Sequence, residues 1–342
     1  MKRNKIILIM PGRVGLYLRD KLPPLFYYLT KNLFTWLISK RVTIPLAILS
    51  LVSYLKQGGF NVVVIDGRVE DALKRLEHEL NDDVLYVGIS ILTGQHITYG
   101  LYCAEKVRKY NKAIPIVWGG VHATLTAEQT LSTCSLADIV VRGEGEITIV
   151  ELSKALHDGT DLSKVIGISY KKNDQILHNE DRPFMDFNSQ LDIDYSSLDP
   201  KYYQFDNFTY QSERGCPHRC EFCDVLVMHR RSFRKKSGER VLQELKSIND
   251  LFHPSRIAFV DDCFFADFKR ANVIIDGLIK AKMGFKWHAS CRAQYFKKTD
   301  AEFWKKAKSS GLSEVYVGVE SGSQKILDYI KKDCTVEDIL NG

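Results

Sequence analysis

The stretch SERGCPHRCEFCDV, residues 212–225, holds three of the eight cysteines of the chain within eight residues. They are Cys216, Cys220 and Cys223, spaced C-x-x-x-C-x-x-C. A structural zinc site usually takes four ligands in two close pairs, whereas the next cysteine, Cys263, follows only after forty residues. A cluster of four irons and four sulfides has four corners, so three cysteines leave one iron open. The spacing favours such a cluster over a zinc site, in which His218 would be the fourth ligand.

The bulk composition sets the frame for this motif. The chain has 342 residues, 45% hydrophobic and 26% charged, with a net charge of +6. This length suits two domains with at least one well-buried core, and the proportions are those of an ordinary globular protein. The mild positive charge fits a solvated surface and does not by itself indicate nucleic acid.

No segment predicts a membrane span or a secretory signal. The run IILIMPG (6–12) is too short, and residues 22–39 are interrupted by Lys31 and opened by prolines. We expect a helix over 22–39 that covers a core or a site entrance. The chain is therefore expected to be cytoplasmic, where thiols stay reduced, so disulfides among the clustered cysteines are not expected.

The first half of the chain alternates short apolar strands with helices. Near-continuous Val, Ile and Leu in each strand indicate a parallel sheet buried on both faces. The alternation predicts a flavodoxin-like, doubly wound α/β domain over residues 1–160. The expected strands are 5–10, 61–66, 84–92, 114–120 and 138–143.

Ligands bind such domains where the strands end at their carboxyl edge. Ser90 and Thr93 offer hydroxyls there for ligand amides or phosphate, and Gly119 and Gly120 let the backbone approach a bulky ligand. A glycine pair also occurs in plain tight turns, which is the simpler reading of those two residues taken alone. Because no G-x-G-x-x-G follows the first strand, a nicotinamide or flavin dinucleotide is not expected.

Four segments in this order resemble the cobalamin-binding domain that precedes a radical S-adenosylmethionine core. They are PLAILSLVSYLKQGGFNVVVID (45–66), GISILTG (88–94), VWGGVHAT (117–124) and VRGEGE (141–146). The resemblance implies cobalamin as a cofactor, bound around Ser90, Thr93, Gly119 and Gly120.

Cobalamin domains that replace the lower axial base use a D-x-H-x-x-G loop after the second strand. Here the loop reads DGRVED (66–71), with Arg68 in the place of the histidine. Arginine stays protonated and cannot ligate cobalt. We therefore expect no histidine of this loop on the lower face.

Residues 161–208 predict a hairpin followed by an irregular linker, which separates the two domains. From residue 209 to 342 strands and helices alternate again, as in a (β/α) barrel with chemistry at the strand carboxyl ends. Only four such units are present where the resembling family has six. We expect a partial barrel that appears truncated, so that the chain is a fragment or a partner covers the open edge.

The cysteine motif resembles the signature of the radical S-adenosylmethionine superfamily. The resemblance implies a [4Fe-4S] cluster on Cys216, Cys220 and Cys223, with S-adenosylmethionine on its open iron. It further implies that Phe222 stacks by the adenine. It also implies roles for residues at the strand ends, although each of these could instead be an ordinary loop cap: the backbone at Asp261 and Asp262 on the amino group, Arg292 on the carboxylate, and Glu320 with Ser321 at the ribose.

Other chemistry-bearing residues have simpler explanations. Cys263 and Cys291 are expected to be buried packing residues near the barrel mouth, and His288 a satisfied wall residue. His122 is expected to bond backbone or ligand rather than metal. The basic run 229–240 is more simply a solvated loop than a phosphate site.

The resemblance implies reductive cleavage of S-adenosylmethionine and hydrogen abstraction from an unactivated carbon, followed by methyl transfer from cobalamin. The alternatives are an oxidative cyclase or rearrangement enzyme on a tetrapyrrole-like or other apolar substrate, and a non-catalytic iron–sulfur or zinc protein. The expected partners are a small-molecule substrate and a reducing protein such as flavodoxin or ferredoxin, with no nucleic acid.

Overall fold

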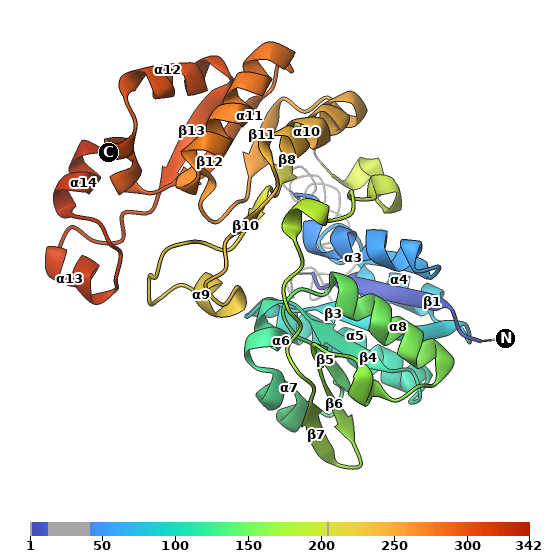
Figure 1. Ribbon diagram of the computed structural model, residues 1–342. Coiled ribbons are helices and arrows are strands. Elements are labelled where there is room, and N and C mark those ends of the chain that lie inside the picture. The colour runs from blue at the N-terminus through green and yellow to red at the C-terminus, as the bar shows by residue number, and fades with distance from the viewer. Residues whose placement is uncertain (1, 13–41, 204) are drawn as a thin grey trace, which may run out of the picture. The chain divides into compact units, whose positions relative to one another are not determined.

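The computed structural model describes residues 2–12, 42–203 and 205–342, which form two compact units. The first unit runs to Phe184 and includes Leu191–Gln204, and the second consists of Met185–Gln190 and Phe205–Gly342. The helix expected over 22–39 lies outside the described residues. Figure 1 labels the helices and strands of both units.

A seven-stranded sheet in the order β2-β1-β3-β4-β5-β6-β7 forms the centre of the first unit. The first five strands are parallel and β6 and β7 are antiparallel. The order β2-β1-β3-β4-β5 is that of a flavodoxin-like sheet, as the sequence predicted. The strands are β1 (Lys5–Met10), β2 (Asn61–Asp66), β3 (Val84–Ser90), β4 (Ile116–Gly119), β5 (Ile139–Val141), β6 (Ile168–Lys172) and β7 (Gln175–His178).

Helices cover both faces of this sheet, so each face has its own apolar core. One core lies under α4 (Ala72–Glu79), α5 (Gln95–Tyr110) and α7 (Ala127–Thr133), and the other under α3 (Leu46–Gln57) and α8 (Glu146–Asp158). Burial on both faces explains why the strands read as continuous apolar runs. Short 3₁₀ turns follow at η1 (Leu162–Lys164), η3 (Tyr195–Ser197) and η4 (Pro200–Tyr202).

The structure differs from the sequence prediction in three places. The sequence predicts helices over residues 99–111 and near 127–134, whereas α5 begins at Gln95 and a further short helix, α6 (Val121–Leu125), precedes α7. The hairpin β6–β7 belongs to the main sheet, because Ile139–Val141 pairs with Ile168–Tyr170. The compact unit therefore continues past residue 160 to Phe184.

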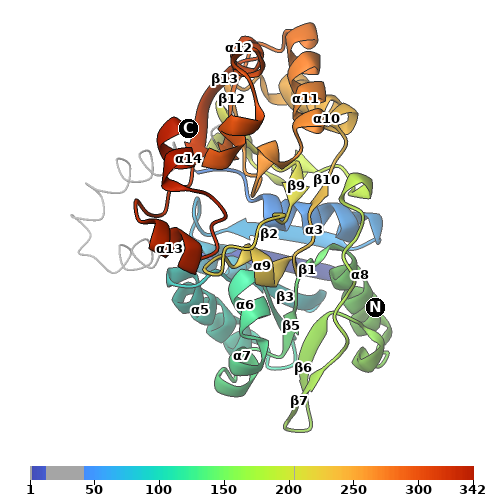
Figure 2. The ribbon, with the colours of Figure 1, turned by 60° about the vertical axis from the view of Figure 1, so that its left-hand side comes forward.

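The second unit contains a parallel sheet in the order β13-β12-β11-β8. Its four strands and their helices follow the predicted β/α series, and Figures 1 and 2 show α10, α11 and α12 along one face. The parallel strands are β8 (Asn207–Tyr210), β11 (Arg256–Phe259), β12 (Lys286–Cys291) and β13 (Leu312–Val317). The helices are α9 (Val225–Met228), α10 (Gly238–Phe252), α11 (Phe268–Ala281), α12 (Ala301–Ser309), α13 (Gln324–Tyr329) and α14 (Val336–Asn341).

Smaller elements complete the second unit. A two-stranded antiparallel ribbon flanks the cysteine loop, with β9 (Glu213–Arg214) before it and β10 (Arg234–Lys235) after it. The 3₁₀ turns are η2 (Phe187–Ser189), η5 (Phe264–Ala266) and η6 (Ala293–Lys298). The ribbon brings the two ends of the loop together.

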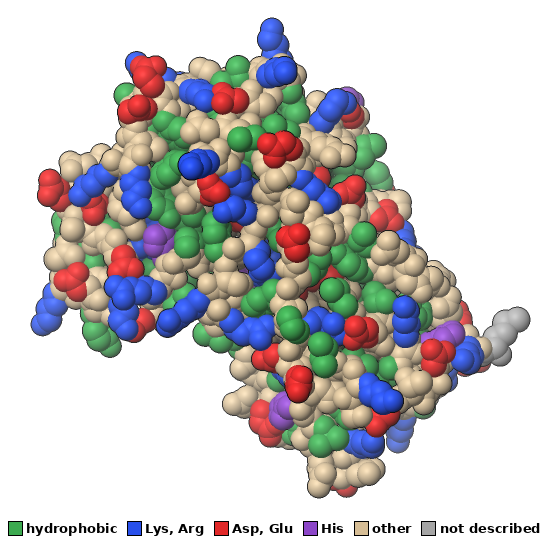
Figure 3. Space-filling model, viewed as in Figure 1, with side chains coloured by type: hydrophobic (Ala, Val, Ile, Leu, Met, Phe, Trp, Pro, Cys, Tyr) green, Lys and Arg blue, Asp and Glu red, His purple; other side chains and the backbone are tan. Residues whose placement is uncertain are grey.

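The described residues contain no helix that is both long and apolar enough to cross a bilayer. Figure 3 shows basic and acidic side chains interspersed on the face drawn, without a large area of one sign. This distribution fits the solvated surface expected from the mild net charge.

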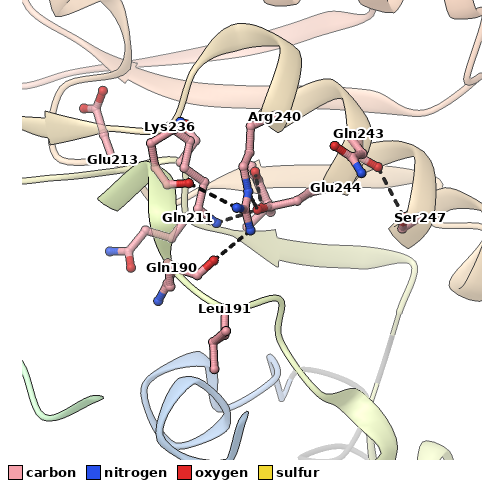
Figure 4. Close-up of polar contacts among 12 residues, drawn as sticks. Gln190, Leu191, Gln211, Glu213, Lys236, Arg240, Gln243, Glu244 and Ser247 are labelled. Carbon is pink, nitrogen blue, oxygen red and sulfur yellow. Dashed lines mark hydrogen bonds and ion pairs between the residues drawn. The ribbon is translucent and has the colours of Figure 1, made fainter. Parts of the chain in front are cut away.

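A buried polar network centred on Glu244 holds the ribbon to α10 (Figure 4). Glu244 Oε2 accepts hydrogen bonds from Lys236 Nζ and from the Tyr210 hydroxyl, both at 2.7 Å, and Oε1 accepts one from Arg240 Nε at 2.7 Å. Arg240 also donates to the Gln190 carbonyl at 2.8 Å. Burial alone would raise the pKa of Glu244, but Lys236, Tyr210 and Arg240 outweigh it and hold the pKa below its ordinary value.

We predict that Glu244→Ala strongly destabilises the second unit. The substitution leaves the ammonium group of Lys236, whose side chain is only 4% exposed, without its main counter-charge. Loss of one partner of a buried pair costs about 3–5 kcal/mol of the free energy of unfolding. Urea denaturation followed by circular dichroism measures this loss.

The matched control is Asp250→Ala, which removes the exposed i,i+4 pair with Lys246 on the same helix. It should change the free energy of unfolding by less than about 0.5 kcal/mol. Equal effects of the two variants would show that the network carries no special stability.

The stability that Glu244 contributes should also depend on pH. Since the folded pKa of Glu244 is lowered, its contribution to the free energy of unfolding is present above the ordinary pKa of 4.5 and is lost as the pH falls below it.

Candidate functional site

The cysteine loop of the second unit is held by the residues immediately before it. Gly215 has φ +84°, and a Cβ there would lie 2.0 Å from the Ser232 carbonyl oxygen, so only glycine fits. The Gly215 N–H donates to Asp262 Oδ2 at 2.9 Å. Beyond this turn Cys220 is buried, while Cys216 and Cys223 are partly exposed.

The electrostatics of the loop favour a thiolate at Cys216. The pKa of Cys216 is lowered to about 7, chiefly by a hydrogen bond with Cys263. The backbone at His218 and the charge of Arg292 lower it further, whereas burial acts in the opposite direction. The same contact and burial raise the pKa of Cys263. Because the thiolate is the metal-binding form, this environment suits a ligand at Cys216.

Arg292 brings a guanidinium group to the loop from the end of β12. Its Nη1 donates to Cys220 Sγ at 3.1 Å, while Nε and Nη2 are buried and have no hydrogen-bond partner among the described residues. Buried unpaired N–H groups of a cation are costly, so they mark a place where an anionic group fits. A carboxylate matches this unfilled part of the guanidinium.

The carboxylates of Asp261 and Asp262 bind the chain rather than facing outward. Asp261 Oδ1 accepts hydrogen bonds from the N–H groups of Ser212 at 2.6 Å and Glu213 at 3.1 Å, and Asp262 accepts one from Gly215. In return Glu213 Oε1 accepts one from the Cys263 N–H at 2.7 Å. The two carboxylates thus fix the entry to the cysteine loop, a role that sequence reasoning missed.

A lysine that sequence reasoning also missed lies close to both Glu320 and Phe222. Lys332 Nζ lies 2.8 Å from Glu320 Oε1 and 5.9 Å from the centre of the Phe222 ring. Glu320 has φ +63°, a strained value for a residue with a side chain. The N–H of the next residue, Ser321, donates to the Val319 carbonyl. The Ser321 hydroxyl oxygen accepts a hydrogen bond from the Ser323 N–H at 3.1 Å.

The histidines of this unit have separate roles. His218 Nε2 lies 2.6 Å from the Tyr295 hydroxyl, and burial, helped by Arg292, lowers the pKa of His218 to about 4. Among the described residues, no three His, Cys, Asp or Glu side chains are grouped to hold a single metal ion. His288 was expected to be satisfied, yet its Nδ1 is buried and has no partner in the part of the chain that the structure describes, and its ring packs edge-on against Tyr316.

In the first unit, the predicted edge residues lie at or just after the ends of β3 and β4, which are neighbours in the sheet. Thr93 Oγ1 lies 3.1 Å from His122 Nδ1. Gly120 has φ +92°, and a Cβ there would lie 2.8 Å from the Ile91 carbonyl oxygen and 3.3 Å from Ser90 Oγ. A side chain at position 120 would therefore collide with the backbone of the protein itself, which explains the glycine. A Cβ at Gly119 would meet only the Val141 carbonyl, at 3.9 Å.

Arg68 is bound to its own loop. Its Nε and Nη2 donate to Asp66 Oδ1 at 2.9 Å and Oδ2 at 2.6 Å, and Nη2 also reaches the Thr43 carbonyl at 2.9 Å. The Tyr203 hydroxyl donates to the second oxygen of Asp66 at 3.0 Å. Both carboxylate oxygens of Asp66 thus accept hydrogen bonds, and Arg68, in the position of the histidine, is bound to this carboxylate.

Two protein families match the chain. Residues 39–153 match the family described as B12 binding domain, and residues 210–342 match the radical SAM superfamily. The first range takes in β2 to β5 but not β1, β6 or β7, and the second begins at the last residue of β8 and takes in the rest of the β/α series.

Curated relatives match both parts. An uncharacterized methyltransferase of Pyrococcus horikoshii is 32% identical over 306 residues, covering 87% of this chain and 65% of that protein. The anaerobic magnesium-protoporphyrin IX monomethyl ester cyclase of Rubrivivax gelatinosus is 25% identical, covering 86% of this chain and 54% of the cyclase. The chain thus spans between about half and two thirds of the length of these relatives.

Solved structures share the fold over nearly the whole chain. The cobalamin-dependent S-adenosylmethionine radical enzyme OxsB superposes with a TM-score of 0.75 at 22% identity, covering 98% of this chain and 46% of OxsB. The radical S-adenosylmethionine methyltransferase TsrM of Kitasatospora setae gives 0.76 at 16% identity, covering 98% and 66%. By the two family matches, the chain consists of a B12-binding domain followed by a radical SAM domain.

Proposed function

We propose that this protein is a cobalamin-dependent radical S-adenosylmethionine enzyme, and that its reaction is a methyl transfer. The observation that carries the proposal is the cysteine loop with Arg292 against it. Three cysteines, one of them with a lowered pKa, lie with a buried guanidinium that has two unpaired N–H groups. Metal-binding thiolates and a carboxylate-binding cation are what a cluster with S-adenosylmethionine on its open iron requires.

The residues fit the cluster. Cys216, Cys220 and Cys223 would hold three irons at separate corners, which does not need their sulfur atoms to converge on one ion. Bound there, a cluster would supply the single electron for reductive cleavage of S-adenosylmethionine. The protein's part is to hold the thiolates ready, fix the loop through Asp261 and Asp262, and keep water out.

Around S-adenosylmethionine each remaining group has one task. Arg292 binds the carboxylate of the methionine through its unpaired N–H groups, and Glu320 accepts hydrogen bonds from the ribose hydroxyls. Phe222, whose side chain is largely exposed, stacks on the adenine, and the backbone at Asp261 and Asp262 receives the amino group. Ser321 lies beside Glu320 at the ribose end.

The first unit would bind cobalamin at the carboxyl edge of its sheet. Ser90, Thr93, Gly119 and Gly120 lie at or just after the ends of β3 and β4 there, and Leu92, two residues after β3, adds an exposed apolar side chain. No histidine from residues 66–71 would meet the lower face of cobalt, because Arg68 occupies that position and is held by Asp66.

Methyl transfer is preferred over the oxidative cyclase alternative, because the relative with 32% identity is named a methyltransferase and the cyclases are near 25%. The substrate would be a small molecule with an unactivated carbon, and a reducing protein such as flavodoxin or ferredoxin would supply the electron. A non-catalytic iron–sulfur protein remains the alternative of another class, and the tests below separate it.

Single replacement of Cys216, Cys220 or Cys223 by alanine is predicted to abolish reductive cleavage of S-adenosylmethionine. Each removes one corner of the cluster. The measurements are iron and sulfide content after anaerobic reconstitution, and 5′-deoxyadenosine formed with dithionite.

Cys291→Ala is the matched control, since Cys291 is a buried thiol in the same unit and contacts the Arg292 backbone. It should keep its iron and its cleavage activity. Iron lost from Cys263→Ala as completely as from Cys216→Ala would mean that four cysteines hold the metal, which contradicts an open iron.

The protein should bind cobalamin without a nitrogen ligand from residues 66–71. Titration of cobalamin into the full chain, followed by the electron paramagnetic resonance spectrum of the cobalt(II) form, tests this. The expected spectrum lacks nitrogen hyperfine structure from an imidazole of the protein. Such structure would contradict the coordination, and absence of any binding would contradict the cofactor assignment. Arg68→His is the positive control, because it restores a possible ligand.

Removing a group that binds S-adenosylmethionine should weaken the ligand and spare the cluster. Arg292→Met and Glu320→Ala each delete hydrogen bonds to a charged group, worth about 1.5–3 kcal/mol each. Calorimetric titration with S-adenosylmethionine should show a rise in Kd of about tenfold or more at unchanged iron content. Affinity equal to wild type in both variants would remove these residues from the site.

A further inference from the structure

A short segment after α13 is fastened to the cysteine loop, and we name it the strap, residues 330–333. The Glu221 N–H donates to the Ile330 carbonyl at 3.1 Å, and Lys331 pairs with the Glu221 carboxylate. Arg219 donates to both oxygens of Asp333, with Nη2 on Oδ1 at 2.9 Å and Nε on Oδ2 at 3.1 Å. One backbone bond and two ion pairs thus join the strap to residues 219–221.

The backbone of the strap separates its side chains into two groups. Lys331 and Asp333 both have φ +53°, a left-handed value that costs free energy in residues other than glycine. Their side chains are partly exposed and pair with the cysteine loop. Between them, the Lys332 side chain is only 7% exposed and enters the interior. Lys332, which lies between these two strained residues, therefore has its side chain on the inner side of the strap.

Lys332 there meets two groups from distant parts of the chain. Its Nζ bonds Glu320, which follows β13, and lies above the ring of Phe222, which belongs to the cysteine loop. The contact is close packed, since a Cβ on Gly318 would lie 3.1 Å from Nζ and 2.8 Å from Glu320 Oε1. Lys332 therefore contacts both the Glu320 carboxylate and the Phe222 ring, and can fix their positions relative to each other.

We propose that Lys332 is a positioning residue for S-adenosylmethionine, which acts through Glu320 and Phe222 and is itself held by the strap. This inference rests on the proposed function, because it assumes that those two residues contact the ligand. The strap then couples the nucleoside end of the site to the cysteine loop before the ligand binds. A strap that merely supports the fold would instead affect cluster assembly and stability, and the two roles have different readouts.

The test compares Lys332→Met, Lys332→Arg and the exposed control Lys325→Met in the reconstituted full chain. Iron content, Kd for S-adenosylmethionine and the rate of 5′-deoxyadenosine formation at saturating ligand are measured. For Lys332→Met we expect unchanged iron, a Kd raised about tenfold or more, and a saturated rate within about twofold of wild type. Lys332→Arg should recover most of the affinity, and Lys325→Met should match wild type.

Two further variants keep the test decisive if Lys332→Met does not fold. Gly318→Ala places a methyl group against the Lys332–Glu320 pair and should raise Kd without removing a charge. Asp333→Arg should weaken binding, and the exchange Arg219→Asp with Asp333→Arg should restore it.

Loss of iron in parallel with affinity, or wild-type affinity in Lys332→Met and Gly318→Ala, overturns the positioning role. Failure of wild-type protein to bind S-adenosylmethionine overturns the proposed function instead, so the two failures are distinguishable.

Discussion

Two adjacent carboxylates at the end of β11 hold the cysteine loop in place, and the site of the second unit depends on them. Asp261 and Asp262 accept the backbone N–H groups of Ser212, Glu213 and Gly215. These groups precede the first cysteine, so their orientation sets the path of the loop. Burial raises the pKa of Asp261, and Arg270 and Ser212 counter it by stabilising the ionised form. The anchor is thus a charged group kept inside the protein because its partners satisfy it.

This anchor is continuous with the network that supports the sheet. Arg270 donates to the Ser212 carbonyl at 3.1 Å and to the Lys236 carbonyl at 2.7 Å, and Lys236 pairs with Glu244. Two hydrogen bonds and one ion pair therefore link α10 and α11 to the entry of the loop. Such a network suits a loop that must present thiolates with little rearrangement, because the buried carboxylates that anchor its entry are themselves hydrogen-bonded.

The two units use parallel sheets in the same general way. In each, the loops that follow the strands collect small and polar residues at the carboxyl edge, while strands such as β1, β3 and β11 are largely buried and apolar, unlike the edge strand β13. The sites differ in how they are held. Arg68, Asp66 and Tyr203 close a loop of the first unit through side chains, whereas the second unit holds its loop mainly through backbone N–H groups on carboxylates. Side-chain closure leaves Arg68 unavailable for other contacts.

The sequence by itself determined the two sheets and the metal-binding motif, because these are local patterns. Alternating apolar runs define the strands, and the spacing of Cys216, Cys220 and Cys223 lies within one loop. It did not determine that the hairpin β6–β7 joins the main sheet, nor that the Asp261 carboxylate accepts the backbone N–H groups at the entry of the cysteine loop. Pairing between segments far apart depends on how the packed elements bring their ends together. Lys332 shows this most clearly, since only the folded chain brings it to both Glu320 and Phe222, which lies 110 residues earlier.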